Sequence, residues 1–284
     1  MFTIRSKQKL SPEVIRIAVD APDVAKRRKP GQFVIVMASE RSERIPLTIC
    51  DADPAAGTIT LIFQVVGSST RDLANLDVGQ SVAHIAGPLG KPTHIENVGT
   101  VCAVGGGVGI ALLYPIAKGF AEAGNRLIVI LGARTKDLLI LQDDMKAFAA
   151  ETLLCTDDGS LGKHAMVTAL VDEVLARPEN VGQCVVVGPA RMMQAVCEQT
   201  RPHNIPTIVS LNPIMVDGTG MCGGCRVTVG GETRFACVDG PEFDGHQVDF
   251  EELIQRQSYY RGEEAEVIKH HDDECKLKGV MDGD

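Results

Sequence analysis

The sequence predicts an antiparallel β-barrel, then a doubly wound α/β domain with a parallel sheet, then a small cysteine module. Three observations predict this order. Short strand-like segments separated by turn signals come first, repeats of an apolar run and a helical pattern follow, and a glycine-rich stretch with three cysteines comes next. We expect domain boundaries at residues 1–98, 99–211 and 212–250, with an acidic tail at 251–284.

The N-terminal region lacks the strand–helix alternation seen later in the chain. Turn-forming residues divide it, at Pro30-Gly31, Asp53-Pro54 and Gly79. Short segments with such frequent turn signals predict an antiparallel barrel rather than βαβ units. The expected strands are 14–19, 32–38, 45–50, 58–66 and 81–86.

The pattern changes at Gly99, after which apolar runs alternate with helical patterns. Such βα repeats are typical of a doubly wound parallel sheet, whose ligand lies beyond the carboxyl ends of the strands. The expected strands and following helices are 100–104 with 109–123, 126–131 with 137–148, 152–156 with 164–176, and 183–187 with 189–200, before a last strand at 206–211.

The composition is that of an ordinary folded protein, with 44% hydrophobic and 23% charged residues. The formal charge of −9 argues against general nucleic-acid binding, because phosphate contacts need a basic face. The start of the chain lacks the apolar core of a signal peptide, and no apolar run is long enough to span a membrane. Together with nine cysteines, an odd number, this predicts a cytoplasmic protein.

The cysteine module begins with Asp217 and a glycine-rich run that contains Cys222 and Cys225, and Cys237 follows. Two thiols separated by two residues, with a third across a short hairpin, indicate a metal or iron–sulfur site. The plant-type ferredoxin spacing C-x4-C-x2-C finds Asp217 at its first position, where a carboxylate could bind iron.

The module therefore predicts a [2Fe–2S] cluster with four protein ligands. The same side chains could instead hold structural zinc. A thiol-exchange pair is disfavoured, because glycines precede and follow the two cysteines where a strand and a helix start are expected. The predicted ligands are Asp217, Cys222, Cys225 and Cys237.

The expected barrel carries the run Arg44-Ile45-Pro46-Leu47-Thr48. A planar guanidinium suits a pyrophosphate because it binds two oxygens at once, and the Thr48 hydroxyl could donate to a flavin ring nitrogen. Alone, the run favours the alternative of an ordinary strand that has an arginine at its start.

A second barrel feature is Gly67-Ser68-Ser69-Thr70, which opens onto a helical pattern. The free N–H groups at a helix start can hold phosphate. The alternative is an ordinary Ser/Thr cap.

A glycine loop follows the first strand of the α/β region and leads into a helix, so it suits a dinucleotide. It departs from G-x-G-x-x-G because Ile110 stands at the sixth position, and a purely structural tight turn is the alternative. Two later strand ends, at 156–160 and 187–190, carry polar or glycine residues that suit the same cleft. The alternative is that they only connect a strand to the next helix. The loop glycines are Gly105, Gly106, Gly107 and Gly109.

Taken together, these motifs and Gly87-Pro88-Leu89-Gly90 resemble, in order over residues 1–211, the ferredoxin–NADP reductase superfamily. With the cysteine module, the chain resembles the electron-transfer subunit of dihydroorotate dehydrogenase. It also resembles the small subunit of NADH-dependent ferredoxin:NADP oxidoreductase, also known as sulfide dehydrogenase. Asp217 favours the second group, because the dihydroorotate subunit has cysteine at that position.

The resemblance implies that the barrel binds FAD and that the α/β domain binds NAD(H). Two departures are Leu112, where the superfamily usually has proline, and Val187, where many reductases have cysteine. The implied FAD residues are Arg44, Pro46, Leu47, Thr48, Gly67 and Thr70. The implied NAD(H) residues are the loop glycines, Arg134, Asp157 and Gly188.

The resemblance also implies a function. NADH would reduce the flavin, and electrons would leave singly through the cluster to a larger flavoprotein subunit that handles NADP and ferredoxin. We expect no catalytic side chain, because hydride transfer between bound rings needs no protein acid or base. Arg134 leaves NADP open as the coenzyme, and the resemblance favours NAD. The alternatives are a dihydroorotate dehydrogenase subunit, a stand-alone oxygenase reductase, or a nucleotide sensor with zinc.

Overall fold

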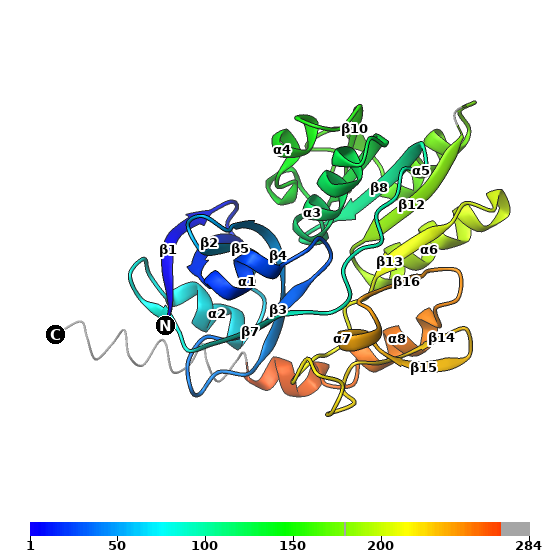
Figure 1. Cartoon of the computed structure of the whole chain (residues 1–284). Coiled ribbons are helices and arrows are strands. Elements are labelled where there is room, and N and C mark those ends of the chain that lie inside the picture. The colour runs from blue at the N-terminus through cyan, green and yellow to red at the C-terminus, as the bar shows by residue number, and fades with distance from the viewer. Residues whose placement is uncertain (179, 268–284) are drawn as a thin grey trace.

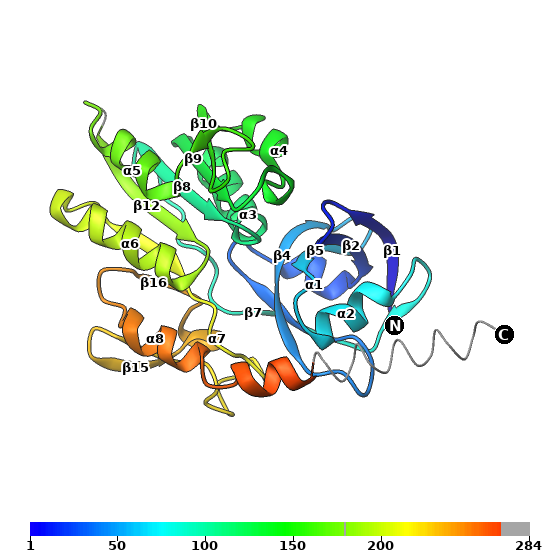
Figure 2. The same cartoon turned by 180° about the vertical axis from the view of Figure 1, so that it is seen from behind.

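The computed structural model describes residues 1–178 and 180–267, so the expected acidic tail beyond residue 267 lies outside the described part. Figure 1 shows the N-terminal sheet, the α/β domain and the cysteine module in chain order, and Figure 2 shows them from behind. Within the described residues, no helix combines the length and the apolar composition needed to cross a membrane.

The N-terminal region is a curled antiparallel sheet in the order β6-β1-β2-β5-β4-β3-β7. Its interior is built from aliphatic side chains and Phe63, which is 2% exposed. The helix α1 begins with Pro22 and Asp23, which favour a helix N-terminus, and it buries Val24 and Ala25 against the sheet. The elements are β1 (Phe2–Lys9), β2 (Val14–Asp20), α1 (Pro22–Arg27), β3 (Phe33–Met37), β4 (Ile45–Asp53), β5 (Thr58–Gln64), α2 (Ser68–Asn75), β6 (Ser81–Val82) and β7 (His84–Leu89).

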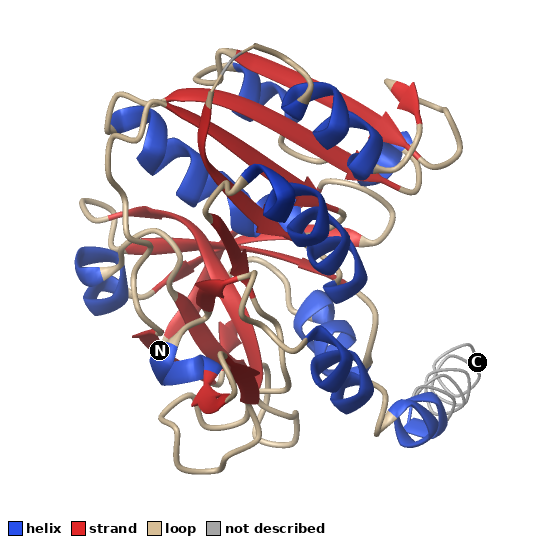
Figure 3. Cartoon of the chain, turned by 90° about the vertical axis from the view of Figure 1, so that its right-hand side faces the viewer, coloured by secondary structure: helices blue, strands red, loops and turns tan. Residues whose placement is uncertain are grey.

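The α/β domain is a sheet in the order β11-β10-β9-β8-β12-β13-β16, parallel except for β16. Helices cover both faces of this sheet (Figure 3). The expected barrel and doubly wound architecture is therefore confirmed. The elements are β8 (Thr100–Gly106), α3 (Gly109–Glu122), β9 (Arg126–Ala133), η1 (Lys136–Leu138), α4 (Gln142–Lys146), β10 (Glu151–Thr156), β11 (Lys163–His164), α5 (Val167–Leu175), β12 (Val181–Val187), α6 (Ala190–Thr200), η2 (Arg201–His203) and β13 (Thr207–Ser210).

The cysteine module supplies the last strand of the α/β sheet. Its β16 pairs antiparallel with β13. The helix α8 begins at the expected end of the module, residue 250, and packs against α6 and against β14 of the module, so we describe it with the module. Gly230 and Gly231 both have positive φ, as the tight turn between β14 and β15 requires. The elements are β14 (Arg226–Val229), β15 (Glu232–Phe235), α7 (Ala236–Asp239), β16 (Glu242–Asp244) and α8 (Phe250–Gln257).

A polar seam joins the cysteine module to the segment after β7. The Lys91 N–H donates to the Gly240 carbonyl over 2.6 Å, and the Thr93 hydroxyl donates to Glu242 Oε1 over 2.6 Å. Burial raises the pKa of Glu242 to about 7, although the hydrogen bond from Thr93 lowers it in part. The folded protein therefore keeps this carboxyl group protonated to a higher pH than the unfolded chain does.

Replacement of Glu242 by glutamine should stabilise the protein at pH 8 but not at pH 4. Between the unfolded pKa of 4.5 and the folded value of about 7, the unfolded chain loses its proton first, so the stability of the wild type falls as pH rises. The amide keeps an acceptor for Thr93 without this penalty, and the expected gain at pH 8 is about 2–3 kcal/mol. Urea unfolding at the two pH values measures it, and an equal effect at both would contradict the assignment.

Candidate functional site

A cavity of about 720 Å³ lies at the carboxyl ends of the parallel strands. The glycine loop after β8 lines its middle, together with Gly188 after β12. Strands β8 and β12 are neighbours in the sheet but not in the sequence, so the cavity lies at the switch point where α/β sheets bind nucleotides. Of the residues predicted for the dinucleotide, the cavity brings together Gly106, Gly107, Gly109, Arg134, Asp157 and Gly188.

The glycines of the loop are needed for close packing. A Cβ on Gly109 would lie 2.6 Å from the Val187 carbonyl oxygen, and a Cβ on Gly106 would collide with the Met192 sulfur. Gly107 has a φ of +56°, which L side chains rarely adopt. Gly105 is buried beneath the loop against Ile110 and Leu113, so its part is to let α3 approach β8.

One end of the cavity carries charge. Arg134 and Asp157 follow β9 and β10, and both line the wall. The Arg134 guanidinium is exposed, 3.9 Å from a carboxylate oxygen of Glu13. An arginine and a carboxylate suit ribose and phosphate groups, so this end fits the adenosine half of a dinucleotide.

The opposite end carries side chains that the sequence analysis did not nominate. Ser210 is the last residue of β13, Asn212 follows that strand, and Gln257 ends α8. The first two could have been found from the rule that strand ends line the cleft. Gln257 could not, because its place depends on how α8 packs against the α/β domain.

The predicted flavin motif lies on and beside β4. Arg44 Nε donates to the Val216 carbonyl over 2.9 Å, so the arginine connects the N-terminal sheet to the start of the cysteine loop, residues 216–225. Leu47 and Thr48 pair with Val34 and Phe33 of β3, and Pro46 pairs with Ile35. Contacts of these residues with FAD stay a prediction.

Thr70 closes the start of α2. Its hydroxyl oxygen accepts hydrogen bonds from the N–H groups of Val66 and Gly67, each over 3.0 Å. The same hydroxyl donates a hydrogen bond to the Gly67 carbonyl over 2.9 Å. The Thr70 side chain therefore acts as a helix cap, which the sequence analysis gave as the alternative to a phosphate site. A phosphate at this turn would be held by backbone N–H groups at the start of α2.

The cysteine loop and helix α7 place two thiols together. Cys225 and Cys237 are both 1% exposed, and their sulfur atoms lie 3.2 Å apart, well beyond the length of a disulfide. Burial beside Cys225 raises the pKa of Cys237 to about 12, so a metal cation is needed to stabilise its thiolate. Cys222 is exposed on the surface of the loop.

Asp217 organises the loop. Its two carboxylate oxygens accept the N–H groups of Thr219 over 2.9 Å and Cys222 over 2.8 Å. These hydrogen bonds, with Thr219 the largest contribution, lower the pKa of Asp217 to about 2, which keeps the carboxylate ionised as a metal ligand must be.

The four predicted ligands are not gathered around one point. Across residues 1–178 and 180–267, no group of three or more His, Cys, Asp or Glu side chains has the arrangement of a metal site. The donor chemistry nevertheless fits iron and sulfur, since the glycine-rich loop supplies an ionised carboxylate and two thiols, and α7, packed beside Cys225, supplies the third thiol. Ligation by Asp217, Cys222, Cys225 and Cys237 stays a prediction.

The loop rests against the N-terminal sheet. Gly218 has a φ of +75°, and a Cβ there would lie 2.6 Å from Leu89 and 3.0 Å from Ile35. The cysteine loop therefore contacts the strands next to the flavin motif directly.

Comparisons with known proteins address the origin of this arrangement. Residues 212–249 match the model of the iron–sulfur cluster binding domain of dihydroorotate dehydrogenase B. A Thermotoga maritima homologue of the dihydroorotate dehydrogenase B (NAD(+)) electron transfer subunit is 49% identical, over 92% of each chain. The chain belongs to this family of electron transfer subunits. The Bacillus caldolyticus electron transfer subunit is 32% identical over 87% of this chain and 97% of its own.

Solved structures extend the comparison. One determined for the NADH-dependent reduced ferredoxin–NADP oxidoreductase, in a study of flavin-based electron bifurcation, matches with 45% identity and a TM-score of 0.91. It covers 95% of this chain and 97% of that chain. The ferredoxin reductase of carbazole 1,9a-dioxygenase shares the fold at 18% identity, with a TM-score of 0.60 over 72% of this chain and 65% of its own. The predicted resemblance to the reductase superfamily and its electron-transfer subunits is confirmed.

Replacement of Asp217 by cysteine should keep the cluster and shift its reduction potential. A hard carboxylate and a soft thiolate stabilise the two iron oxidation states differently. Redox titration followed by visible absorbance measures the shift. Asp217→Ala is the complementary variant, and an unaltered cluster spectrum and potential in it would show that Asp217 is not a ligand.

Proposed function

We propose that this protein is an oxidoreductase subunit that exchanges electrons with NAD(H) through FAD and passes them singly through a [2Fe–2S] cluster to a larger flavoprotein subunit. The observation that supports this best is the Arg44–Val216 hydrogen bond of 2.9 Å. It joins the flavin motif to the start of the cysteine loop, four residues after Asn212 at the wall of the dinucleotide cavity. Three electron carriers would then follow one another within one chain.

The flavin, when bound, supplies the conversion between two-electron and one-electron transfer. The protein residues bind and orient. Val108 and Gly109, at the start of α3, line the cavity, and the free N–H groups of this helix start would hold the pyrophosphate of NAD(H). The Arg44 guanidinium keeps its terminal nitrogens for the flavin phosphates while Nε fixes the cysteine loop. No side chain is required to move a proton during hydride transfer.

The cysteine loop would ligate iron through Asp217, Cys222 and Cys225, and α7 would supply Cys237 as the fourth ligand. The eight cysteines of the described residues are all free thiols, which supports a reducing compartment such as the cytoplasm. A dihydroorotate dehydrogenase electron-transfer subunit is the second candidate, favoured by the names of several relatives. Asp217 favours the first candidate, because the electron-transfer subunits of dihydroorotate dehydrogenase have cysteine at this position.

Anaerobic purification from the source cell tests the proposal. We expect a coloured protein that contains iron and FAD, whose flavin absorbance is bleached by NADH, together with a larger flavoprotein subunit. Reduction of ferredoxin and NADP by the purified pair would support the first candidate, and oxidation of dihydroorotate would support the second. A preparation with zinc and no flavin would overturn both.

A further inference from the structure

The dinucleotide cavity has two chemically different ends. Arg134 and Asp157 follow β9 and β10 at one end, and Asn212 and Gln257 lie at the other, beyond β13. In the sheet, β8 and β12 with their glycine turns separate these ends, because the strand order is β10-β9-β8-β12-β13. A dinucleotide whose pyrophosphate lies at the glycine loop therefore places one nucleoside at each end.

The Asn212 end is the one close to the flavin motif. Asn212 precedes Val216 by four residues, and the Val216 carbonyl accepts the Arg44 hydrogen bond. Gly218 then packs against Leu89 of β7 and Ile35 of β3. Since the nicotinamide must reach the flavin, it lies at this end, and the charged end takes the adenosine.

The two amides at this end fix each other's orientation. Gln257 Nε2 donates to the Asn212 backbone carbonyl and to Asn212 Oδ1, each over 3.0 Å. A carbonyl oxygen can only accept, so the Gln257 amide must present its nitrogen to Asn212, and Asn212 must present Oδ1 in return. Gln257 Oε1 and Asn212 Nδ2 are left, and neither atom has a hydrogen-bond partner within residues 1–178 and 180–267.

One remaining acceptor beside one remaining donor complements a primary carboxamide, which offers an oxygen and an NH₂ group in one plane. We propose that Asn212 and Gln257 bind the carboxamide of the nicotinamide ring, with Asn212 Nδ2 donating to its oxygen and Gln257 Oε1 accepting from its nitrogen. This inference rests on the proposed function. It assigns part of the NAD(H) site to α8 of the cysteine module, so the module completes the coenzyme site as well as carrying the cluster ligands.

Binding of NAD⁺ and of 3-acetylpyridine adenine dinucleotide to the oxidised, fully loaded protein tests the two contacts separately. The analogue has a methyl group in place of the carboxamide nitrogen but keeps the carbonyl oxygen. The wild type should bind NAD⁺ about tenfold more tightly, because the analogue leaves Gln257 Oε1 unpaired. Titration calorimetry gives both dissociation constants without turnover.

The two variants should differ in a defined way. Gln257→Met should weaken NAD⁺ about tenfold and bring the ratio of the two dissociation constants near one. Asn212→Asp keeps the oxygen that accepts from Gln257 but removes the donor, so it should weaken both ligands and leave the ratio as in the wild type. Gln255→Met, an exposed change on the same helix, is the matched control and should alter neither constant.

The outcomes separate this inference from the proposed function. Failure of the wild type to bind NAD⁺, or of NADH to bleach its flavin, overturns the function and this inference with it. If the wild type binds NAD⁺ and its flavin is bleached, but Gln257→Met keeps the wild-type ratio, only the carboxamide assignment is overturned. Equal weakening of both ligands by Gln257→Met at an unchanged melting temperature would likewise overturn it. If Gln257→Met folds poorly, Asn212→Asp tests the assignment independently, and wild-type affinity for both ligands in that variant would overturn it.

Discussion

Replacement of Cys225 by alanine should remove most of the iron from the protein while leaving the flavin reducible by NADH. Cys225 is 1% exposed, and its sulfur lies 3.2 Å from that of Cys237, so the variant removes one thiol of the buried pair. Loss of a direct ligand should cost more than the roughly 10–100-fold in metal affinity that loss of a supporting hydrogen bond costs. Iron analysis, the visible spectrum and the reduction rate of a one-electron acceptor measure the effect.

Cys102→Ala is the control for this variant. Cys102 is also 1% exposed, but it lies in β8 next to Cys184, away from the cysteine module. The same change of thiol to methyl should therefore keep iron and acceptor reduction, with a loss of stability of about 1 kcal/mol from the small cavity. Equal iron content in the two variants would contradict the assignment of Cys225 as a ligand.

The α/β domain was predictable because its parallel strands are buried on both faces and form continuous apolar runs. The helix expected at 137–148 is wrong in extent, since only Gln142–Lys146 is α-helical after a short 3₁₀ turn. Leu139, Ile140 and Leu141 are all buried, and Leu141 has a φ of +55°, so the chain turns here to bury three consecutive side chains. A surface helix cannot bury such a run.

The strand β1 was missed because its sequence has almost no apolar alternation. Ile4 is its one fully buried residue, and the strand is held by backbone pairing with β2 and β6. The segment 22–27 was missed as a helix for a related reason: it is short, and it buries only Val24 and Ala25. Local pattern does not reveal elements that depend on their neighbours for stability.

The candidate site also has one part that the sequence predicts and another part that depends on tertiary packing. The glycine loop, Arg134, Asp157 and Gly188 were predictable because the carboxyl ends of parallel strands share one edge of the sheet. The Arg44–Val216 contact spans 172 positions in the chain, and the position of Gln257 depends on the packing of α8. Contacts of this kind follow from tertiary packing, and no spacing rule contains them.

Replacement of Gly109 by alanine should both destabilise the protein and weaken NAD⁺ binding. The added Cβ would lie 2.6 Å from the Val187 carbonyl oxygen and 2.9 Å from Gly188, both backbone positions that cannot rotate away. The start of α3 must then move off β12, at an expected cost of about 1–3 kcal/mol. Because the same helix start lines the cavity, we expect NAD⁺ affinity to fall about tenfold or more. Urea unfolding and calorimetry measure the two effects.

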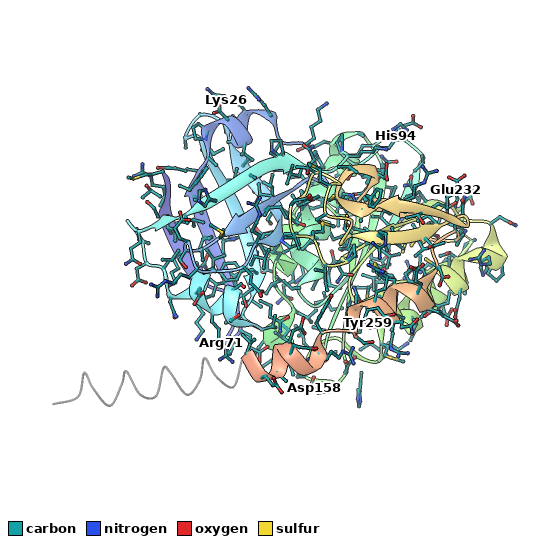
Figure 4. The ribbon with its side chains drawn as sticks, turned by 90° about the horizontal axis from the view of Figure 1, so that it is seen from below. Lys26, Arg71, His94, Asp158, Glu232 and Tyr259 are labelled. Atoms are coloured by element: carbon teal, nitrogen blue, oxygen red, sulfur yellow. The ribbon has the colours of Figure 1, made fainter. Side chains whose placement is uncertain are left out.

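Gly262→Ala separates steric displacement from a general effect of glycine replacement. Gly262 lies in a helical segment, and a Cβ there meets nothing within 4 Å. This segment follows Tyr259, at the edge of the molecule in Figure 4. Alanine favours a helix over glycine by about 1 kcal/mol, so this control should be neutral or slightly stabilising, with NAD⁺ binding unchanged. Wild-type stability and NAD⁺ affinity in Gly109→Ala would mean that α3 can retreat without cost, and that its close approach to β12 is not what shapes the coenzyme site.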